Sequence, residues 1–329
     1  MSTLPRTLCP RCRGELQVTA DAQHCTNCGH DYPVVAGIPD LRIAPDPWID
    51  FADDRAKGVS VDSRAAPGFE AAVREYWRQT PATTAADAER HIDHVLGAAK
   101  RSRQWLSALH HEPAAGEVWL DLGCGTADLA CAAPAQVSVV GLDIAFRWLV
   151  VARRRLAEAG RTDPLVCGNA EALPYPAQSF DRVIALGLLE HCADLDPIFS
   201  EVARVLKPGG RFHARASNRF TLLREPHVGV WGVGFVPRAL ADGYVRALGG
   251  SGYQHHSPHS AAAISAAMQR AGLRDIAVTA AQMLGAEAHR LPRWLAPVVP
   301  LYDAARSRPI ARSLTRLVAP MLEAEGVAP

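Results

Sequence analysis

The sequence lacks three features that would place it in a special class of protein. None of its apolar runs reaches about 18 residues, which excludes an ordinary transmembrane helix. The first eight residues contain no apolar stretch of the kind a signal peptide needs, so we expect a cytoplasmic protein. An excess of one charge is also missing, because 35 basic residues stand against 34 acidic ones. This balance argues against a broad nucleic-acid-binding surface and leaves room only for a local one.

The remaining composition is that of an ordinary globular protein. Hydrophobic residues make up 48% of the 329 positions and charged residues 21%, so wholesale disorder is not expected. This length predicts one large domain together with a smaller part, or two modest domains.

Half of the eight cysteines are gathered in two C-x-x-C pairs near the N-terminus. A chain without an export signal keeps its thiols reduced, so disulfides explain these pairs poorly. Two such turns facing each other supply a closed, tetrahedral set of four thiolates, which suits structural zinc. The predicted zinc ligands are Cys9, Cys12, Cys25 and Cys28.

The residues around the cysteines predict a small metal-dependent fold. Gly14 and Gly29 follow the two pairs, where each turn is expected to need a positive φ. Residues 15–19 and 32–35 read as short strands that bracket the metal. About 40 residues bury too little core to fold alone, so the ion would supply the missing stability. Residues 8–42 resemble the zinc ribbons that accompany some enzymes.

The region after the ribbon predicts a loose connection followed by helices. Residues 43–68 carry several prolines and acidic residues and read as a linker. Helices are expected over 69–79 and 86–109, the second from its apolar period. Tyr76 and Trp77 are expected to pack on the core rather than to cover an active site.

The strongest motif is a strand, a glycine turn, a helix and a second strand. An apolar run at 118–122 predicts a buried strand that ends in Gly123 and Gly125. The second strand, at 137–142, ends at Asp143. The glycines let the backbone approach a ligand closely, and an acid in this place accepts hydrogen bonds from ribose hydroxyls.

Two acids decide which nucleoside fits this motif. A dinucleotide fingerprint needs a third glycine where this sequence has Asp128, whose charge would repel a phosphate. Asp121, two residues before the first glycine, suits a cationic group instead. S-adenosylmethionine carries an amino group, a ribose and a sulfonium but no phosphate. The pattern therefore favours S-adenosylmethionine over NAD.

Residues 117 to about 280 resemble class I S-adenosylmethionine-dependent methyltransferases of the broad small-molecule (type 11-like) group. Four motifs occur in the family's order and spacing, at 121–126, 141–143, 167–191 and 201–214. The resemblance implies an α/β fold with a Rossmann-like, doubly wound, seven-stranded sheet. The alternation of apolar segments agrees with such a parallel sheet, whatever the ligand. Helices are expected at 145–159, 194–206 and 259–271, strands at 164–167, 181–186 and 210–216, and a final antiparallel pair at 275–280 and 317–323.

The resemblance also assigns roles to single residues. It implies that Asp121 and the two glycines line the methionine half, that Asp143 holds the ribose and that Asn169 borders the adenine. The family commonly has Asp in place of Asn169, but an amide oxygen still accepts a hydrogen bond. Ala127 stands where a third glycine is common. The expected cofactor contacts are Asp121, Gly123, Cys124, Gly125, Asp143, Ile144, Asn169, Ala170, Leu186 and Gly187.

These segments predict three parts. A zinc ribbon covers 1–43, a linker with N-terminal helices covers 44–112, and the methyltransferase domain covers 113–329 with insertions at 217–257 and 282–315. The first insertion is longer than an ordinary connection and is expected to enclose the acceptor together with helix 69–79.

Methyl transfer to a hydroxyl usually needs a general base, and histidine suits that task near neutral pH. His191 follows a strand that the family places near the reactive methyl, and His227 lies in the first insertion. We take these two as the candidate bases and Arg238 as a candidate for an anionic acceptor group. The other histidines of the insertion, His255, His256 and His259, are expected to be loop or helix-cap residues.

Three functions are compatible with these features. The first is methyl transfer from S-adenosylmethionine to a small-molecule or lipid-like acceptor. The second is methylation of ribosomal or transfer RNA, with the ribbon gripping the RNA. Balanced ribbon charges and the lack of an N-P-P-Y type motif argue against it. The third is a non-catalytic binding module on the same fold.

Overall fold

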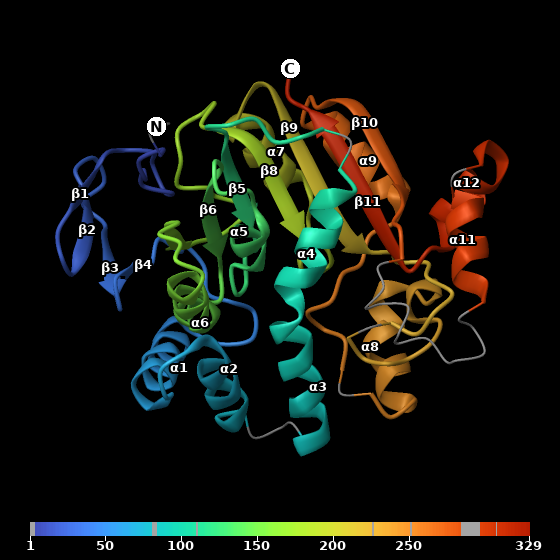
Figure 1. Cartoon of the computed structure of the whole chain (residues 1–329), viewed down its shortest axis with the longest axis horizontal. Coiled ribbons are helices and arrows are strands. Elements are labelled where there is room, and N and C mark those ends of the chain that lie inside the picture. The colour runs from blue at the N-terminus through green and yellow to red at the C-terminus, as the bar shows by residue number, and fades with distance from the viewer. Residues whose placement is uncertain are drawn as a thin grey trace. The chain divides into compact units, whose positions relative to one another are not determined.

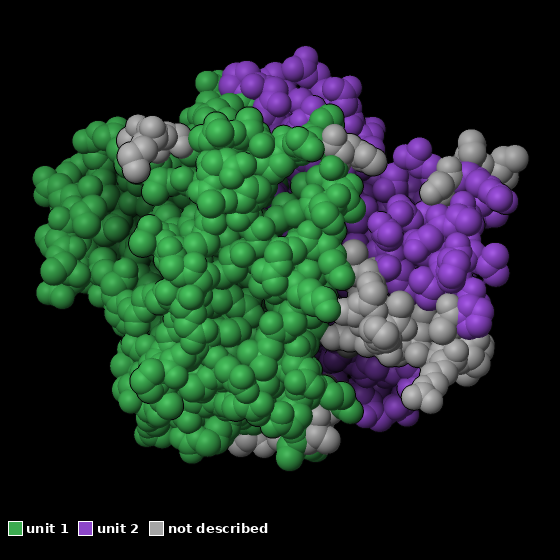
Figure 2. Space-filling model, viewed as in Figure 1, with its two compact units in different colours: residues 1–183, 204–207 green, residues 184–203, 208–329 purple. Residues whose placement is uncertain are grey.

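The structure is a computed structural model, and it describes residues 4–80, 84–109, 111–225, 227–250, 252–283, 297–306 and 308–329. The chain forms two compact units (Figure 2). The first comprises Met1–Val183 with Arg204–Lys207, and the second comprises Ile184–Ala203 with Pro208–Pro329. None of the described helices is long and apolar enough to cross a membrane. The three-part division expected from the sequence stays a prediction.

A small antiparallel sheet lies at the N-terminus of the first unit (Figure 1). Its strands follow chain order: β1 Leu16–Val18, β2 Ala22–Cys25, β3 Asp31–Val35 and β4 Ile38–Pro39. Ala36 and Gly37 join β3 to β4 with φ values of 49° and 75°, the two positive values that a tight hairpin turn requires. The two predicted strands are present as β1 and β3, and β2 and β4 are additions that the sequence did not indicate.

The glycine after the first cysteine pair does not have the predicted backbone conformation. The positive φ, 60°, belongs to Arg13, whereas Gly29 has the expected one at 70°. Gly14 is needed for space instead, because a Cβ there would lie 2.6 Å from the Cβ of Asn27 and 3.1 Å from the Sγ of Cys25. The two knuckles therefore use glycine for different reasons.

The predicted loose linker over 43–68 is wrong, because most of it is a helix. Helix α1 spans Phe51–Arg64 and begins at Asp50, whose carboxylate accepts a hydrogen bond from the Asp53 N–H at 2.8 Å. Gly58 lets α1 approach α6 (Phe146–Glu158), since a Cβ there would lie 2.8 Å from the ring of Phe146. The acidic residues that suggested a linker are the cap and first turn of this helix.

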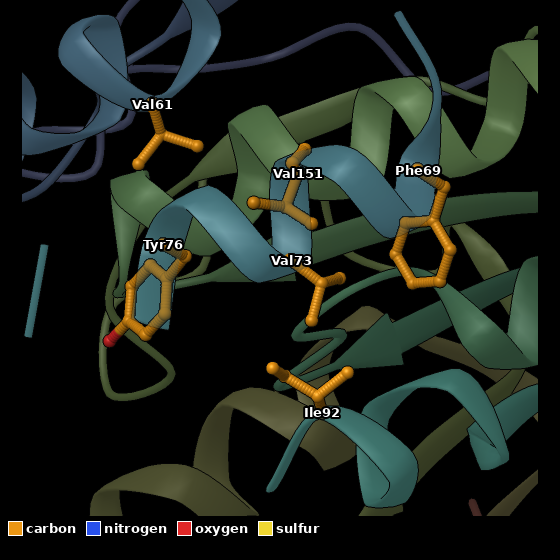
Figure 3. Packing of buried hydrophobic residues seen from close by; sticks show 7 residues of the cluster. Val61, Phe69, Val73, Tyr76, Ile92 and Val151 are labelled. Carbon is orange, nitrogen blue, oxygen red and sulfur yellow. The ribbon is translucent and has the colours of Figure 1, made fainter. Parts of the chain in front are cut away.

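One further correction concerns the helices that follow. Helix α2 spans Phe69–Arg78 as predicted. The single helix expected at 86–109 is two, α3 Ala85–Leu96 and α4 Ala98–Ser107, with Gly97 between them. Helices α1, α2, α3 and α6 share an apolar cluster (Figure 3). Tyr76 lies in it, so this ring packs in the core as expected; the cluster's buried members are Val61, Phe69, Ala72, Val73, Tyr76, Ile92 and Val151.

The main sheet has seven strands in the order β10-β11-β9-β8-β5-β6-β7, as expected for the predicted fold (Figure 1). Strands β5 to β7 pair in parallel, while β11 pairs antiparallel with both β9 and β10. The order reverses direction beside β5, and such switch points are where open α/β sheets bind ligands. The bounds are β5 Val118–Leu122, β6 Ser138–Asp143, β7 Leu165–Cys167, β8 Phe180–Leu186, β9 Leu206–Ser217, β10 Arg274–Ala280 and β11 Met321–Val327.

The remaining helices match the predicted alternation closely. The final strand is shifted from its predicted place at 317–323, because α12 continues to Val318 and the chain becomes extended only after Pro320. Within the insertion predicted at 282–315, residues 284–296 lie outside the described residues. The helices are α5 Asp128–Ala132, α6 Phe146–Glu158, α7 Asp196–Val205, α8 Arg238–Ala247, α9 Ala261–Arg270, α11 Val298–Arg306 and α12 Pro309–Val318, with short 3-10 turns η1 Leu189–His191 and η2 Val233–Phe235.

Candidate cofactor and metal sites

The turn between β5 and α5 has a backbone that few side chains tolerate. Gly123, Gly125 and Ala127 have φ values of 78°, 49° and 56°. The N–H groups of Gly123 and Cys124 both donate to the carbonyl of Leu142, at 2.8 and 3.0 Å, which ties the turn to β6. Ala127 adopts the left-handed conformation without being glycine, at a cost of about 1 kcal/mol. The predicted glycine turn is therefore present, held in a strained shape.

Two carboxyl groups flank this turn, the buried Asp121 and the half-buried Asp143. Asp121 is 3% exposed, and among the described residues its side chain has no hydrogen-bond partner. Burial raises the pKa of Asp121 well above its usual value, and the charges of Asp128 and Asp143 add to the effect. Asp143 accepts hydrogen bonds from the N–H groups of Gly125 and Ala145, both at 2.8 Å. Burial still raises the pKa of Asp143.

Asp128, in the place of a third glycine, is engaged elsewhere. Its carboxylate accepts a 2.5 Å hydrogen bond from Ser102 and lies 3.9 Å from the guanidinium of Arg155. Asp121 thus differs from Asp128 in having no hydrogen-bond partner for its carboxylate among the described residues. A buried carboxylate of this kind favours a ligand that donates hydrogen bonds to it or carries a positive charge.

The Asn169 side chain contacts the backbone of the segment that follows the ribbon. Its amide oxygen accepts hydrogen bonds from the N–H groups of Ile43 and Ala44, at 2.8 and 3.2 Å, and its amide nitrogen donates to the Ala44 carbonyl at 3.3 Å. The segment after the ribbon is therefore held against the end of β7. The predicted contact between Asn169 and adenine, like that of the half-buried Ala170, stays a prediction.

The same segment belongs to a buried ionic network that the sequence did not reveal. The Arg42 side chain is fully buried and donates to Asp40 at 2.7 Å, to Asp54 at 2.6 Å and to the Ile144 carbonyl at 2.9 Å. Arg147 donates to Asp54 at 2.8 Å. These contacts join the ribbon's end and α1 to the segment that follows Asp143.

Asp54 acts as the N-terminal cap of α6, although it belongs to α1. Its two carboxylate oxygens accept from the N–H groups of Phe146 and Arg147, at 2.9 and 3.2 Å. Ala145, which precedes α6, has no side-chain oxygen to do this. A carboxylate also interacts favourably with the positive end of the helix dipole. The linker helix thereby positions the turn that carries Asp143.

The last two predicted cofactor contacts lie in the second unit. Leu186 ends β8, and Gly187 follows with a φ of 80° and donates its N–H to the Arg215 carbonyl at 2.8 Å. The second unit therefore contains the strand end that the family motif predicts.

Among the described residues, two groups of side chains converge as metal ligands do, and the first is the predicted cysteine set. Its four sulfur atoms all lie within 4.8 Å of one another. Cys9 and Cys28 are 3.7 Å apart, and Cys12 and Cys25 are 3.5 Å apart. Zinc–sulfur bonds of about 2.3 Å imply edges of roughly 3.8 Å in a tetrahedron. The four thiols therefore fit a zinc ion.

The second group is made of histidines and lies in the second unit. His191, His227 and His256 have ring nitrogens within 4.8 Å of one another. His191 and His227 are the two candidate bases predicted from the sequence, and the structure places their ring centroids 5.0 Å apart. The sequence predicts a loop residue at His256, although its ring stacks on His227 at 4.4 Å. No local signal identifies the third histidine.

Two carboxylates accompany these histidines. His227 Nδ1 is 2.7 Å from the Glu225 carboxylate. Burial alone would lower the pKa of His227, but Glu225 and Glu190 outweigh burial and raise it. Burial and the charges of His227 and His191 lower the pKa of His256 to about 4. His259 is buried and separate, with Nε2 2.8 Å from the Cys192 carbonyl.

Comparison with known proteins finds a match over the part of the chain that contains the glycine turn. Residues 120–214 match the family described as a methyltransferase domain. This part of the chain is a methyltransferase domain. Demethylmenaquinone methyltransferase of Symbiobacterium thermophilum is 40% identical over 119 residues, which cover 34% of this chain and 47% of that protein.

Two other similar proteins are named for different activities. The 27-O-demethylrifamycin SV methyltransferase of Amycolatopsis mediterranei is 36% identical over 146 residues, covering 43% of this chain and 52% of that protein. Phosphoethanolamine N-methyltransferase 2 of Haemonchus contortus, solved with S-adenosylmethionine, is 18% identical with a TM-score of 0.47, covering 70% of this chain and 52% of that one. The chain spans about half the length of the curated relatives it matches.

Proposed function

We propose that this protein transfers a methyl group from S-adenosylmethionine to a small-molecule or lipid-like acceptor. The observation that carries the proposal is the buried, unsatisfied Asp121 beside the strained glycine turn, in a domain of the methyltransferase family. A ligand with a cationic group and a ribose would complete this arrangement without bringing a phosphate near the acids.

Each residue of the turn would have one task. Asp121 would attract the positive part of the methionine moiety, and the glycines would leave room for it. Asp143 would accept hydrogen bonds from the ribose hydroxyls, because each carboxylate oxygen has a second lone pair beyond the one used by Gly125 or Ala145. Binding both ends of the donor would orient the methyl group for attack.

The proposed acceptor class is supported by the relatives' names and by the second unit's surface. Relatives are named for demethylmenaquinone and demethylrifamycin, both small molecules. The segment from β9 to α9 exposes several large apolar side chains, which an apolar acceptor would contact. These are Leu222, Trp231, Phe235, Leu240 and Leu248.

For a hydroxyl acceptor, the transfer is an in-line displacement. The acceptor oxygen bonds to the methyl carbon as the carbon–sulfur bond breaks, and that electron pair stays on sulfur as a neutral thioether. The hydroxyl proton goes to a base, for which we propose His191 or His227. Since the Glu225 carboxylate can only accept, His227 Nδ1 donates to it and Nε2 remains the basic atom.

We also propose that the four cysteines hold a structural zinc ion. The distances between their sulfur atoms fit a zinc ion, which supports this proposal. A sheet of four such short strands buries little apolar surface, so a bound ion would supply stability that the core lacks. Four thiolates fill the coordination shell, so this ion would stabilise the ribbon and take no part in methyl transfer.

A methyl-transfer assay with labelled S-adenosylmethionine tests the proposal. The full chain is incubated with a panel of hydroxylated quinones, phenols and polyketides, and in parallel with total RNA. Label in one of the small molecules is expected, and it should fall with Asp143→Ala. Label recovered only in RNA would instead establish the alternative acceptor, and label in neither, with no binding of the donor, would refute methyl transfer.

A further inference from the structure

We infer that His191, His227 and His256 form a second metal site, which takes a divalent transition-metal ion such as Zn²⁺. Three imidazole nitrogens are the protein ligands of many catalytic zinc sites, in which the fourth position stays open for water or a substrate oxygen. The inferred site is thus different in kind from the closed four-cysteine site of the ribbon.

The ligand spacing fits such an ion. Metal–nitrogen bonds of about 2.0–2.1 Å place tetrahedral ligand atoms roughly 3.4 Å apart. The three nitrogens lie within 4.8 Å of one another without an ion, so small side-chain rotations bring them to bonding distance. The rings come from three separate segments and meet pairwise, with centroid distances of 5.0, 5.4 and 4.4 Å.

Hydrogen bonds join two of these three segments, those of His191 and His256. The Ser257 N–H donates to the Glu190 carbonyl at 2.7 Å, so a hydrogen bond joins the residues next to His256 and His191. A second tie joins the same segments, because His259 Nε2 lies 2.8 Å from the Cys192 carbonyl. Ligands on a rigid frame lose little freedom when an ion binds.

Glu225 fixes the third segment and orients its ligand. One of its carboxylate oxygens accepts from the N–H groups of His227 and Val228, at 2.7 and 2.9 Å. The other lies 2.7 Å from His227 Nδ1, which leaves Nε2 for the metal. A carboxylate bonded to the second nitrogen of a histidine is the usual outer partner of a histidine metal ligand. This contact distinguishes the cluster from a chance stack of rings.

Charge around the cluster also suits a dication. Glu225 is 5% exposed and Glu190 is 3% exposed, and Glu190 Oε2 has no hydrogen-bond partner among the described residues. Two buried carboxyl groups beside the three imidazoles suit a dication, because they would help to balance its charge. His227 retains a side-chain exposure of 26%, so an ion can reach it from solvent.

Metal binding does not depend on methyl transfer, but the ion's role in the reaction rests on the proposed function. An acceptor hydroxyl bound at the open position would lose its proton more readily, because the ion stabilises the resulting oxyanion. The ion would then replace a free imidazole as the means of activating the acceptor.

The test compares the zinc content of two proteins that both contain the four cysteines of the ribbon. The difference between them therefore reports only the histidine site. Full-length wild type and the triple variant His191→Ala/His227→Ala/His256→Ala are equilibrated with Zn²⁺, desalted and analysed for zinc per chain. We expect the wild type to hold one more equivalent than the triple variant. His255→Ala, which changes the neighbouring histidine outside the cluster, should keep the full content. Circular dichroism checks that each variant is folded.

Two further readouts separate a metal site from a structural cluster. Glu225→Gln should weaken binding about 10- to 100-fold without abolishing it. Co²⁺ bound in the extra equivalent should show weak d–d absorption without the thiolate charge-transfer bands of the ribbon. Equal zinc contents in the wild type and the folded triple variant would overturn the inference, as would an equal loss in His255→Ala. Either result is obtained without turnover, so it is independent of the proposed methyl transfer.

Discussion

Replacing Asp121 by Asn should change ligand binding and stability in opposite directions. The carboxyl is buried and without a hydrogen-bond partner among the described residues, so its charge destabilises the ligand-free protein. In the complex the same charge would face the cationic part of S-adenosylmethionine. A side chain with a merely structural role would not give effects of opposite sign.

The expected size of each effect follows from these surroundings. A hydrogen bond to a charged group contributes about 1.5–3 kcal/mol, so the Asn variant should bind S-adenosylmethionine about 10- to 150-fold more weakly. The ligand-free variant should be more stable at neutral pH by about 1 kcal/mol, or roughly 2–4 °C in the unfolding midpoint. The amide still leaves polar atoms buried, which keeps this gain small.

The stability difference should depend on pH in one direction. Burial raises the pKa of Asp121 in the folded state, so the folded protein holds this proton more tightly than the unfolded chain does. Below about pH 3.9, the usual pKa of Asp, the carboxyl is protonated in both states and the wild type suffers no penalty. As the pH rises through the folded-state pKa, the wild type loses stability relative to the variant.

Calorimetric titration and thermal unfolding of the ligand-free proteins measure the two effects. Asp128→Asn is the matched control, because that carboxylate already has Ser102 as a partner and should change the affinity less than about 3-fold. Unchanged affinity in Asp121→Asn, or a loss of stability at neutral pH, would refute the reasoning.

Three further predictions concern the scaffold. Asp54→Ala should destabilise the protein by about 3 kcal/mol in chemical unfolding, because it removes one acceptor from each of two buried guanidinium groups, which keep Asp40 and Asp46, and removes the side-chain cap of α6. Gly58→Val should lower the unfolding midpoint, since its Cβ would meet the Phe146 ring at 2.8 Å, whereas Gly243→Ala in open space should raise it slightly. Cys12→Ser should reduce the ribbon's zinc content and its amide protection in hydrogen exchange, while the strands of the main sheet stay protected.

The sheet and its glycine turn could be predicted because their signals are local. The apolar run of β5, the glycines after it and the acid at the end of β6 lie within about 25 consecutive residues. Buried strands and special backbone conformations restrict residue type strongly at each position. The cysteine pairs are local in the same sense, and the structure brings all four thiols together.

Helix α1 could not be predicted in this way, because its stability depends on partners far along the chain. Its buried Asp54 is matched by Arg42 before it and by the start of α6, more than 90 residues later. An acidic, proline-flanked sequence looks like a linker until those partners are known. The prediction at Gly14 was wrong for a related reason. Glycine is needed there because a side chain would collide with Asn27, which is distant in sequence, and not because the backbone has a positive φ.

The histidine cluster shows the same limit at a candidate site. His191, His227 and His256 are separated by tens of residues, and no spacing rule connects them. Only the convergence of the three rings in the folded chain reveals that they form one group.

Calorimetric titration of the folded, full-length protein with S-adenosylmethionine and S-adenosylhomocysteine tests the central claim most directly. The account predicts that one molecule of either binds per chain, at the glycine turn between Asp121 and Asp143. The absence of binding to either compound, in a sample shown to be folded, would contradict it.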